Sequence, residues 1–230
     1  LYCSIEEMLA ECELDVVDIV TGPDTHPELV HAAARAGKHI MCQKPFARTI
    51  EAAEEMVRVA ERYGVRLMVT ENWRWLQPYQ QIGQMIQSGT LGTLRAARYI
   101  HTDWYTPRME PGVELPQPFF RDMEKLLFFE MGPHWFDTWR FLFGTPERLY
   151  AETAKISPHV IGEDTGFVIL RGSDQYGPEF IGMMDMSWAT RHKLDRPLGN
   201  EVGPVHLEQL YIDGDEATLK LYTDGRITVI

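Results

Sequence analysis

The chain has 230 residues and a formal net charge of −12 at pH 7, with 22 Lys and Arg against 34 Asp and Glu. This balance argues against a nucleic-acid partner, which is bound through clustered Lys and Arg, and the absence of any segment of roughly 20 apolar residues argues against a membrane partner. Three cysteines, Cys3, Cys12 and Cys42, are too few for a disulfide framework in a chain this long, so we expect a soluble protein with reduced thiols and a cytoplasmic location.

The first third of the chain alternates helical and strand patterns. Ser4 and Glu7 have capping-box spacing, Thr49 is a candidate N-cap, and Gly37 and Gly64 follow helical patterns as C-terminal signals. In chain order we expect a helix from Ser4, a strand at 14–20, a helix at 26–37, a strand at 38–42, a helix at 49–64 and a strand at 65–70. Strands separated by helices predict βαβ units and a parallel sheet.

After Thr70 the pattern changes. We expect a helix at 77–92, a strand at 93–104, a Pro-rich loop at 107–118, a helix at 134–144 begun by Pro133, and strands at 148–156, 165–172, 179–190, 207–214 and 217–225. Turn signals between several of these strands favour hairpins and therefore antiparallel pairing. The chain is predicted to be α/β, with a parallel part at residues 1–73 and an α+β domain with a mainly antiparallel sheet at 74–230.

Lys44 directly follows a predicted apolar strand. In open parallel sheets, ligands bind beyond the carboxyl ends of the strands, so Lys44 is expected to face that edge, with its backbone restricted by Pro45. The alternative is a lysine that extends into water from a strand end. Thr21 and Gly22 follow the preceding strand at the same edge, and Asp24 or Thr25 is a candidate cap for the next helix. An ordinary loop with a normal cap is the alternative there.

At this point the residues resemble a known family. The segment at residues 16–69 is similar to the central part of the Gfo/Idh/MocA oxidoreductases, which include glucose–fructose oxidoreductase and inositol dehydrogenase. The family's T-P-x-x-x-H turn is represented by residues 21–26, which read TGPDTH, and its E-K-P motif by Gln43, Lys44 and Pro45. The resemblance continues through "ENWRWLQPY", "MGPHWFDTWRFLFG" and "GEDTGFVILRGS", so it covers essentially the whole chain.

The resemblance implies an NAD(P)-dependent dehydrogenase that moves a hydride between nicotinamide and a hydroxyl carbon of a sugar or polyol. Lys44 would stabilise the developing alkoxide, His134 would be the general base, and Glu130 would orient the imidazole or hold a substrate hydroxyl. Substrate contacts are expected from Arg74 and Asp137, and the second-domain sheet is expected to form a homo-oligomer. Cofactor contacts are expected from Thr21, Gly22, Pro23, His26, Gln43, Lys44 and Asn72.

The sequence departs from the family pattern in three places. Gln43 replaces the glutamate of the motif, "EKLLFF" replaces a glycine-rich run before Glu130, and no G-x-G-x-x-G fingerprint occurs. We therefore expect a Rossmann-type sheet that lacks its first three strands, in a chain truncated at both ends. We further expect the 230 residues alone to bind NAD or NADP poorly.

Two other classes stay open. One is a non-catalytic small-molecule binding or assembly protein of the same fold, in which Gln43 and Glu130 mark lost chemistry. The other is a metal-assisted hydrolase that uses Glu130, His134 and Asp137, although no second histidine lies nearby in the sequence, which makes zinc ligation weak. A metal is therefore not expected.

Overall fold

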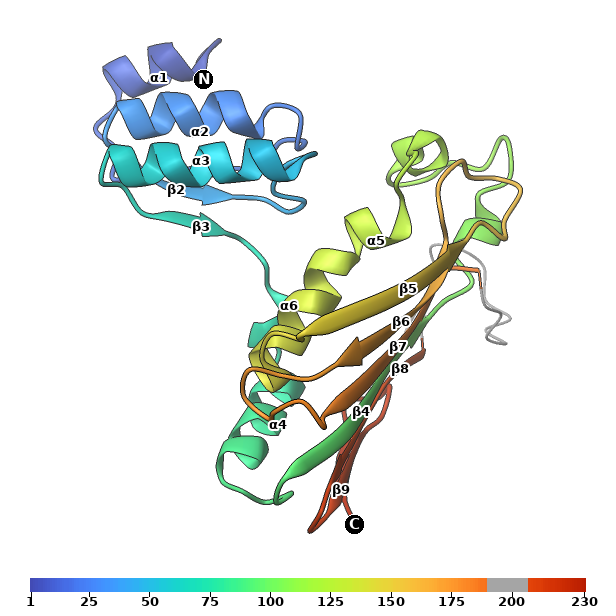
Figure 1. Ribbon diagram of the computed structural model, residues 1–230. Helices are drawn as coiled ribbons and strands as arrows, with labels where there is room; N and C mark the ends of the chain where they lie inside the picture. The colour runs from blue at the N-terminus through green and yellow to red at the C-terminus, as the bar shows by residue number, and fades with distance from the viewer. Residues whose placement is uncertain (190–206) are drawn as a thin grey trace. The chain divides into compact units, whose positions relative to one another are not determined.

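The computed structural model describes residues 1–189 and 207–230. The chain divides into two compact units, Leu1–Asn72 and Trp73–Ile230, and each has its own hydrophobic core. The division lies one residue from the boundary predicted from the sequence. The two units are coloured in chain order in Figure 1.

The first unit is a three-stranded parallel sheet with helices on one face. Its elements are α1 (Ile5–Glu11), β1 (Val16–Ile19), α2 (His26–Arg35), β2 (His39–Cys42), α3 (Ile50–Arg62) and β3 (Leu67–Val69). The strand order is β1-β2-β3, and α1, α2 and α3 lie side by side over the same face (Figure 1). The predicted parallel α/β arrangement is confirmed.

Alternation along the strands separates the two faces of this sheet. Val17, Ile19 and Ile40 are buried against the helices, because successive strand side chains point to opposite faces. Met41 and Met68 point the other way and are exposed. The helix limits follow the expected signals. The hydroxyl of Thr49 accepts a hydrogen bond from the Ala52 N–H at 3.2 Å at the start of α3, and Gly64 has a φ of 66° beyond its end.

The second unit is a seven-stranded sheet with helices on one face (Figure 1). Its strand order is β10-β9-β8-β4-β7-β6-β5. Among the described strands of this second sheet, β4 and β7 are the only neighbours that pair in parallel. Its elements are η1 (Trp73–Trp75), α4 (Gln77–Gln87), β4 (Leu94–Thr102), η2 (Thr106–Arg108), η3 (Pro118–Asp122), α5 (Leu127–Glu130), α6 (Gly132–Phe143), β5 (Arg148–Ala154), β6 (Thr165–Arg171), β7 (Ile181–Ser187), β8 (Leu207–Gly214), β9 (Thr218–Leu221) and β10 (Ile227–Val229). The predicted mainly antiparallel sheet is confirmed.

Several boundaries differ from the sequence prediction. The helix expected to have Pro133 as its first residue begins one residue earlier, at Gly132, and Pro133 lies in its first turn, where a missing N–H costs no hydrogen bond. The short helix α5 was not predicted, because "LFFE" has no helical signal of its own. The strand predicted at 179–190 is ordered as β7 from Ile181 to Ser187, and Thr190 lies outside the described residues.

The core of the second unit forms where α4 and α6 cover the inner face of the sheet. Trp135, Trp139 and Phe143 of α6 are buried among strand residues such as Met184. Gly182 of β7 allows the closest approach, because a Cβ built there would lie 2.2 Å from the indole of Trp139. Across the two described ranges, no helix is long and apolar enough to cross a membrane.

Candidate active site

Lys44 lies immediately beyond β2, the central strand of the first unit. Its backbone N–H donates to Oε1 of Gln43 at 2.8 Å. The Gln43 N–H in turn donates to the Ile19 carbonyl at 2.9 Å, which continues the pairing of β2 with β1. The Lys44 backbone therefore has a defined position at the carboxyl end of the parallel sheet, as predicted.

Gln43 stands where the family motif has glutamate, and its hydrogen bond with Lys44 shows which function of the glutamate the amide can keep. An amide oxygen accepts a hydrogen bond from the Lys44 N–H as a carboxylate oxygen does, without adding a negative charge beside the ammonium. The departure from the family motif thus keeps the backbone geometry and removes one charge.

The loop after β1 lies at the same edge of the sheet. The Thr25 hydroxyl donates to the Gly22 carbonyl at 3.0 Å and lies 2.6 Å from the Thr21 hydroxyl. A Cβ built on Gly22 would meet no atom within 4 Å, so open space lies beside this backbone. Of the two candidate caps of α2, Thr25 is the N-cap residue, although its side chain makes no cap hydrogen bond. Asp24 is paired with Arg48 instead.

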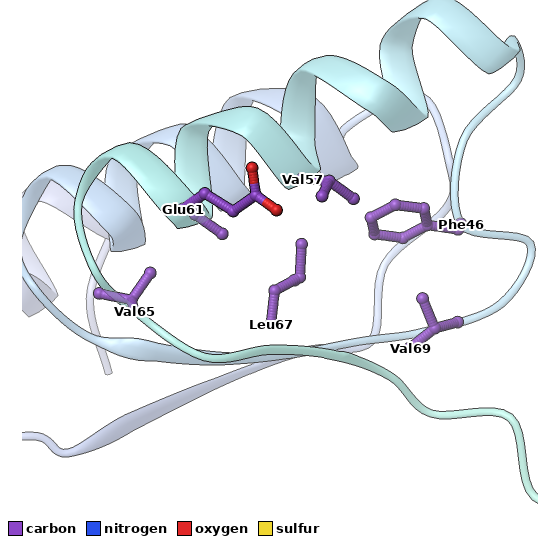
Figure 2. A pocket seen from close by; sticks show the side chains of 7 residues that line it. Phe46, Val57, Glu61, Val65, Leu67 and Val69 are labelled. Carbon is purple, nitrogen blue, oxygen red and sulfur yellow. The ribbon is translucent and has the colours of Figure 1, made fainter.

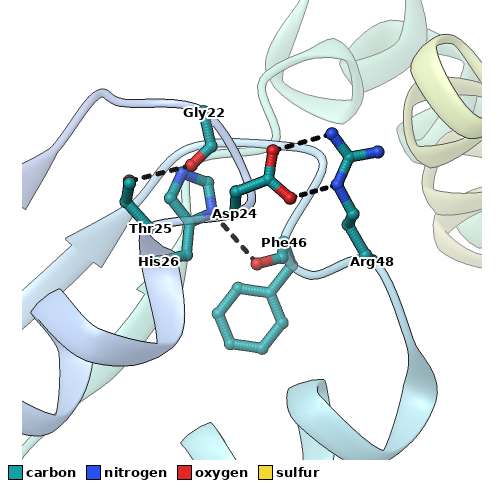
Figure 3. A network of polar contacts seen from close by, with 6 residues as sticks. All are labelled: Gly22, Asp24, Thr25, His26, Phe46 and Arg48. Carbon is teal, nitrogen blue, oxygen red and sulfur yellow. Dashed lines mark hydrogen bonds and ion pairs between the residues drawn. The ribbon is translucent and has the colours of Figure 1, made fainter. Parts of the chain in front are cut away.

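His26 connects the loops that follow β1 and β2. Nε2 lies 2.9 Å from the Thr21 carbonyl oxygen and Nδ1 lies 3.0 Å from the Phe46 carbonyl oxygen, and the side chain is fully buried. Figure 3 shows the contact with Phe46 beside the ion pair of Asp24 and Arg48. The Arg48 guanidinium, through its hydrogen bonds, holds the pKa of the Asp24 carboxyl below its usual value, and the nearby His26 adds a smaller contribution in the same direction. Asn72, also predicted to contact the cofactor, is exposed at the end of the first unit.

A hollow of about 240 Å³ lies between α3 and β3 (Figure 2). Its walls are apolar except for the Glu61 side chain: Phe46, Val57, Ala60, Glu61, Val65, Leu67 and Val69. None of the residues predicted to bind the cofactor or substrate lines it. The hollow therefore carries no support for the predicted cofactor or substrate contacts.

His134 lies in the first turn of α6, in the second unit. Its imidazole stacks on the indole of Trp73, with ring centres 4.7 Å apart and planes 14° apart. The ring centres of Trp73 and His101 lie 5.3 Å apart, and those of His101 and Trp135 also lie 5.3 Å apart. We call Trp73, His101, His134 and Trp135 the histidine cluster. His134 and His101 are both buried within it, so the candidate base has a fixed ring plane.

Glu130 ends α5, and only Met131 separates it from α6. The Met131 N–H donates to the Leu127 carbonyl at 2.8 Å, and the His134 N–H donates to the Met131 carbonyl at 3.0 Å. The sequence left open whether one helix carries both Glu130 and His134; the structure shows two helices with a nearly continuous hydrogen-bonded path. Both side chains are buried.

Arg74 and Asp137, the two predicted substrate contacts, bind each other. Nε of Arg74 donates to Oδ2 of Asp137 at 2.5 Å, and a second N–H donates to Oδ1, so the pair is bidentate. The pairing joins η1 to α6, 63 positions along the chain. In the residues that the structure describes, Glu130, His134 and Asp137 do not form a group that could hold a metal ion.

Three polar residues near these elements escaped the sequence analysis. Glu163 accepts hydrogen bonds from the backbone N–H groups of Leu126 and Phe128 at 3.2 and 3.1 Å, at the start of α5. Asp164 is fully buried and accepts from the Thr106 hydroxyl and from two backbone N–H groups. Glu208 accepts from the hydroxyl groups of Tyr79 and Tyr99. A sequence signal existed only for the "GEDTG" segment, whose acidic pair interrupts an otherwise apolar stretch.

Comparison with known proteins decides the family. Residues 1–71 match the model of the oxidoreductase family with an NAD-binding Rossmann fold, and residues 79–220 match the GFO/IDH/MocA C-terminal domain. The chain belongs to the Gfo/Idh/MocA oxidoreductase family. The resemblance inferred from the sequence motifs is thereby confirmed.

Individual members of the Gfo/Idh/MocA family align along the whole chain. It is 34% identical over 229 residues to a D-apiose dehydrogenase of Paraburkholderia graminis and 32% identical over 228 residues to one of Rhizobium rhizogenes. The alignments cover 100% and 99% of this chain and 56% and 61% of the relatives. A solved Agrobacterium radiobacter oxidoreductase, in complex with NAD⁺, L-tartaric acid and magnesium, is 30% identical with a TM-score of 0.84, over 98% of this chain and 61% of that one. The chain thus spans less than two thirds of the length of these relatives.

Proposed function

We propose that the protein acts as an NAD(P)-dependent dehydrogenase on a hydroxyl carbon of a sugar, polyol or related small molecule. The observation that carries the proposal is the lysine held at the carboxyl end of the central parallel strand, in a chain that aligns from end to end with proteins named D-apiose dehydrogenase. Ligands of open parallel sheets bind at that edge. Free cysteines at Cys3, Cys12 and Cys42 support the proposed cytoplasmic location.

Each residue has a separate task in this proposal. The Lys44 ammonium stabilises the negative charge that develops on the substrate oxygen, and the His134 imidazole accepts the hydroxyl proton. Glu130 orients the imidazole or binds a neighbouring substrate hydroxyl. The nicotinamide, when bound, supplies the hydride acceptor.

Substitutions in the full-length enzyme test these roles. Lys44→Met removes the charge at similar length, and His134→Asn removes the base; each should lower kcat by about 10²–10⁴-fold. Lys155→Met changes an exposed lysine of the second unit and should leave kcat unaltered. Turnover that survives Lys44→Met would refute the role of Lys44. A wild-type protein that binds the small molecule without turnover would support the alternative class, a non-catalytic binding or assembly protein, in which Lys44→Met changes affinity only.

The cofactor contacts proposed for this chain are those of the nicotinamide end. Thr21, Gly22, Pro23, Gln43 and Asn72 are the candidates, and the open space beside Gly22 fits a close approach of a ligand to the backbone. The pyrophosphate fingerprint G-x-G-x-x-G does not occur in the 230 residues. We therefore expect this chain by itself to bind NADH and NADPH more weakly than micromolar. Fluorescence titration measures this, with a full-length relative as the positive control, and micromolar affinity would refute the expectation.

The proposed substrate class follows the names of the relatives. D-apiose is the first candidate because two relatives that align along the whole chain carry that name. Arg74 and Asp137 are proposed to meet substrate hydroxyls as a bidentate pair, so Arg74→Lys, which loses the fork geometry, should raise KM more than it lowers kcat. Full-length enzyme assayed with D-apiose, myo-inositol and NAD⁺ or NADP⁺ decides the substrate and cofactor. Equal inactivity with all sugars and polyols would reject this class.

We also propose that the outer face of the seven-stranded sheet mediates homo-oligomerisation. Phe167, Ile169 and Ile181 are exposed on neighbouring strands β6 and β7, and Tyr150 lies opposite Ile169 on β5. Contiguous exposed apolar surface of this kind marks interaction sites. Ile169→Lys should shift the mass in analytical ultracentrifugation towards the monomer, whereas Glu179→Lys, in the loop before β7, should not. A monomeric wild-type protein would refute the proposal.

A further inference from the structure

The strongest unassigned feature of the first unit is the position of the His26 side chain. It is 0% exposed, so it has no surface with which to contact a bound cofactor. Both ring nitrogens already face protein oxygens, at 2.9 Å from the Thr21 carbonyl and 3.0 Å from the Phe46 carbonyl. The expected role as a cofactor contact therefore does not fit its surroundings.

The two partners of His26 belong to the two loops of the candidate site. Thr21 follows β1, at the start of the loop proposed to receive the cofactor, and Phe46 lies two residues after Lys44. The imidazole bridges these loops from the first residue of α2, a helix packed on the sheet. Because α2 fixes its Cα, His26 restrains both loops relative to the rigid part of the unit.

Both partners of the ring are carbonyl oxygens, which only accept hydrogen bonds. Whichever ring nitrogen carries the N–H therefore donates to the carbonyl of one loop, and the other nitrogen packs against the carbonyl of the second loop at a similar distance. The buried ring thus lies between the two backbones in either tautomer.

We propose that His26 is a positioning residue whose buried imidazole bridges the loop after β1 and the loop after β2, and so fixes the loop carrying Lys44. This inference rests on the proposed catalytic role of Lys44. The Asp24–Arg48 ion pair joins the same two loops, but both of its side chains are more than half exposed. Since exposed ion pairs contribute little, the buried imidazole is the effective connection.

Hydrogen exchange tests the restraint without reference to activity. His26→Asn shortens the side chain and breaks both contacts, so exchange in residues 43–48 should accelerate by about tenfold, while α3 remains protected. R48Q removes the exposed pair on the same loop and should change exchange less than twofold. Unchanged exchange in a folded His26→Asn variant would overturn the proposal.

His26→Gln supplies a second variant where His26→Asn fails to fold. The longer glutamine amide can still reach one of the two carbonyl oxygens, so exchange in residues 43–48 should accelerate by less than in His26→Asn. Exchange as slow as in the wild-type chain would overturn the proposed bridge.

Kinetics of the full-length enzyme separate this inference from the proposed function. His26→Asn should lower kcat by about tenfold and leave KM for the cofactor within twofold. In the Lys44→Ala background the same change should have no further effect, because His26 acts through Lys44. An equal tenfold loss in that background would overturn the positioning role. If Lys44→Ala keeps full turnover while the exchange result holds, the restraint stands and the catalytic assignment falls.

Discussion

The His134 imidazole and the Trp73 indole form the best-defined contact at the candidate base, with ring planes 14° apart. A general base transfers a proton efficiently only when its ring is held at a fixed angle to the substrate. Trp73 is thus the residue that sets the plane of His134, although 61 positions separate the two along the chain.

The first prediction concerns this stack. Trp73→Ala in the full-length enzyme should lower kcat by about tenfold, because the imidazole gains rotational freedom. Trp73→Phe keeps an aromatic face and should retain most of the activity. Steady-state kinetics measures both variants, and circular dichroism checks that they are folded. Equal losses in the two variants would contradict a role for the stacked ring.

Residues of the candidate site could be predicted where the signal is local in the sequence, but not where it depends on a contact between distant residues. Lys44 was proposed from a local signal, a strand end before proline, whereas His134 was proposed from the resemblance to the family. The pairing of Arg74 with Asp137 was not predicted, although both were named as substrate contacts, because no local pattern links residues 63 positions apart. The two carbonyl partners of His26 were missed for the same reason.

At the scale of elements, α5 depends on a residue outside its own sequence. Its four residues are too few to form a stable helix alone, and the Glu163 carboxylate accepts from two N–H groups at its start. A carboxylate at a helix N-terminus also interacts favourably with the positive end of the helix dipole. Glu163 therefore supports the segment that leads to Glu130 and His134.

The second prediction removes this cap. Glu163→Ala should lower the free energy of unfolding by about 1–2 kcal/mol, since two N–H groups lose their acceptor. Glu163→Gln keeps one acceptor oxygen and should lose less. Urea unfolding followed by tryptophan fluorescence measures the change, with Glu124→Ala at a nearby exposed position as the control. A loss no larger than that of the control would refute the capping role.

The third prediction concerns the interface of α4 with the sheet, where burial raises the pKa of Glu208 to about 7, from a usual value near 4.5. Between these two values the folded protein binds more protons than the unfolded chain, so its stability should fall as pH rises through this window. The difference corresponds to about 3 kcal/mol by pH 8.

Glu208→Gln isolates this contribution because glutamine stays uncharged and keeps an acceptor for Tyr79 and Tyr99. The variant should match the wild type at pH 4.5 and be more stable at pH 8 in urea unfolding. Parallel pH profiles of the two proteins would show that Glu208 does not titrate in this range.

The extent of the elements was predictable where end signals were strong. Thr49 and Gly64 delimited α3 to within a residue, because capping is a local interaction. Pro133 predicted the start of α6 to within one residue as well. The helix α5 was not predicted, because its cap comes from Glu163, far along the chain. The sequence did not predict the strand order of the large sheet either. Hairpin signals indicate antiparallel neighbours and cannot indicate the parallel pairing of β4 with β7.

At the scale of the whole molecule, two separate hydrophobic clusters stabilise the chain. The first contains buried residues from Val17 to Val59 and the second from Tyr79 to Leu221. The fourth prediction is that unfolding proceeds in two steps, because units with independent cores need not unfold together, and that the smaller first unit unfolds first. Differential scanning calorimetry should show two components, and Met56→Ala should shift only the lower one. A single transition whose calorimetric and van't Hoff enthalpies agree would contradict this.

The position of β4 in the large sheet affects how the chain is made. β4 is complete by Thr102, yet its two neighbours are β7, which ends at Ser187, and β8, which ends at Gly214. A ribosome adds about 5–20 residues per second, so this strand waits several seconds with both edges unpaired. Unpaired strand edges pair readily with strands of other chains, so nascent chains of this protein are expected to need a chaperone at the ribosome during synthesis.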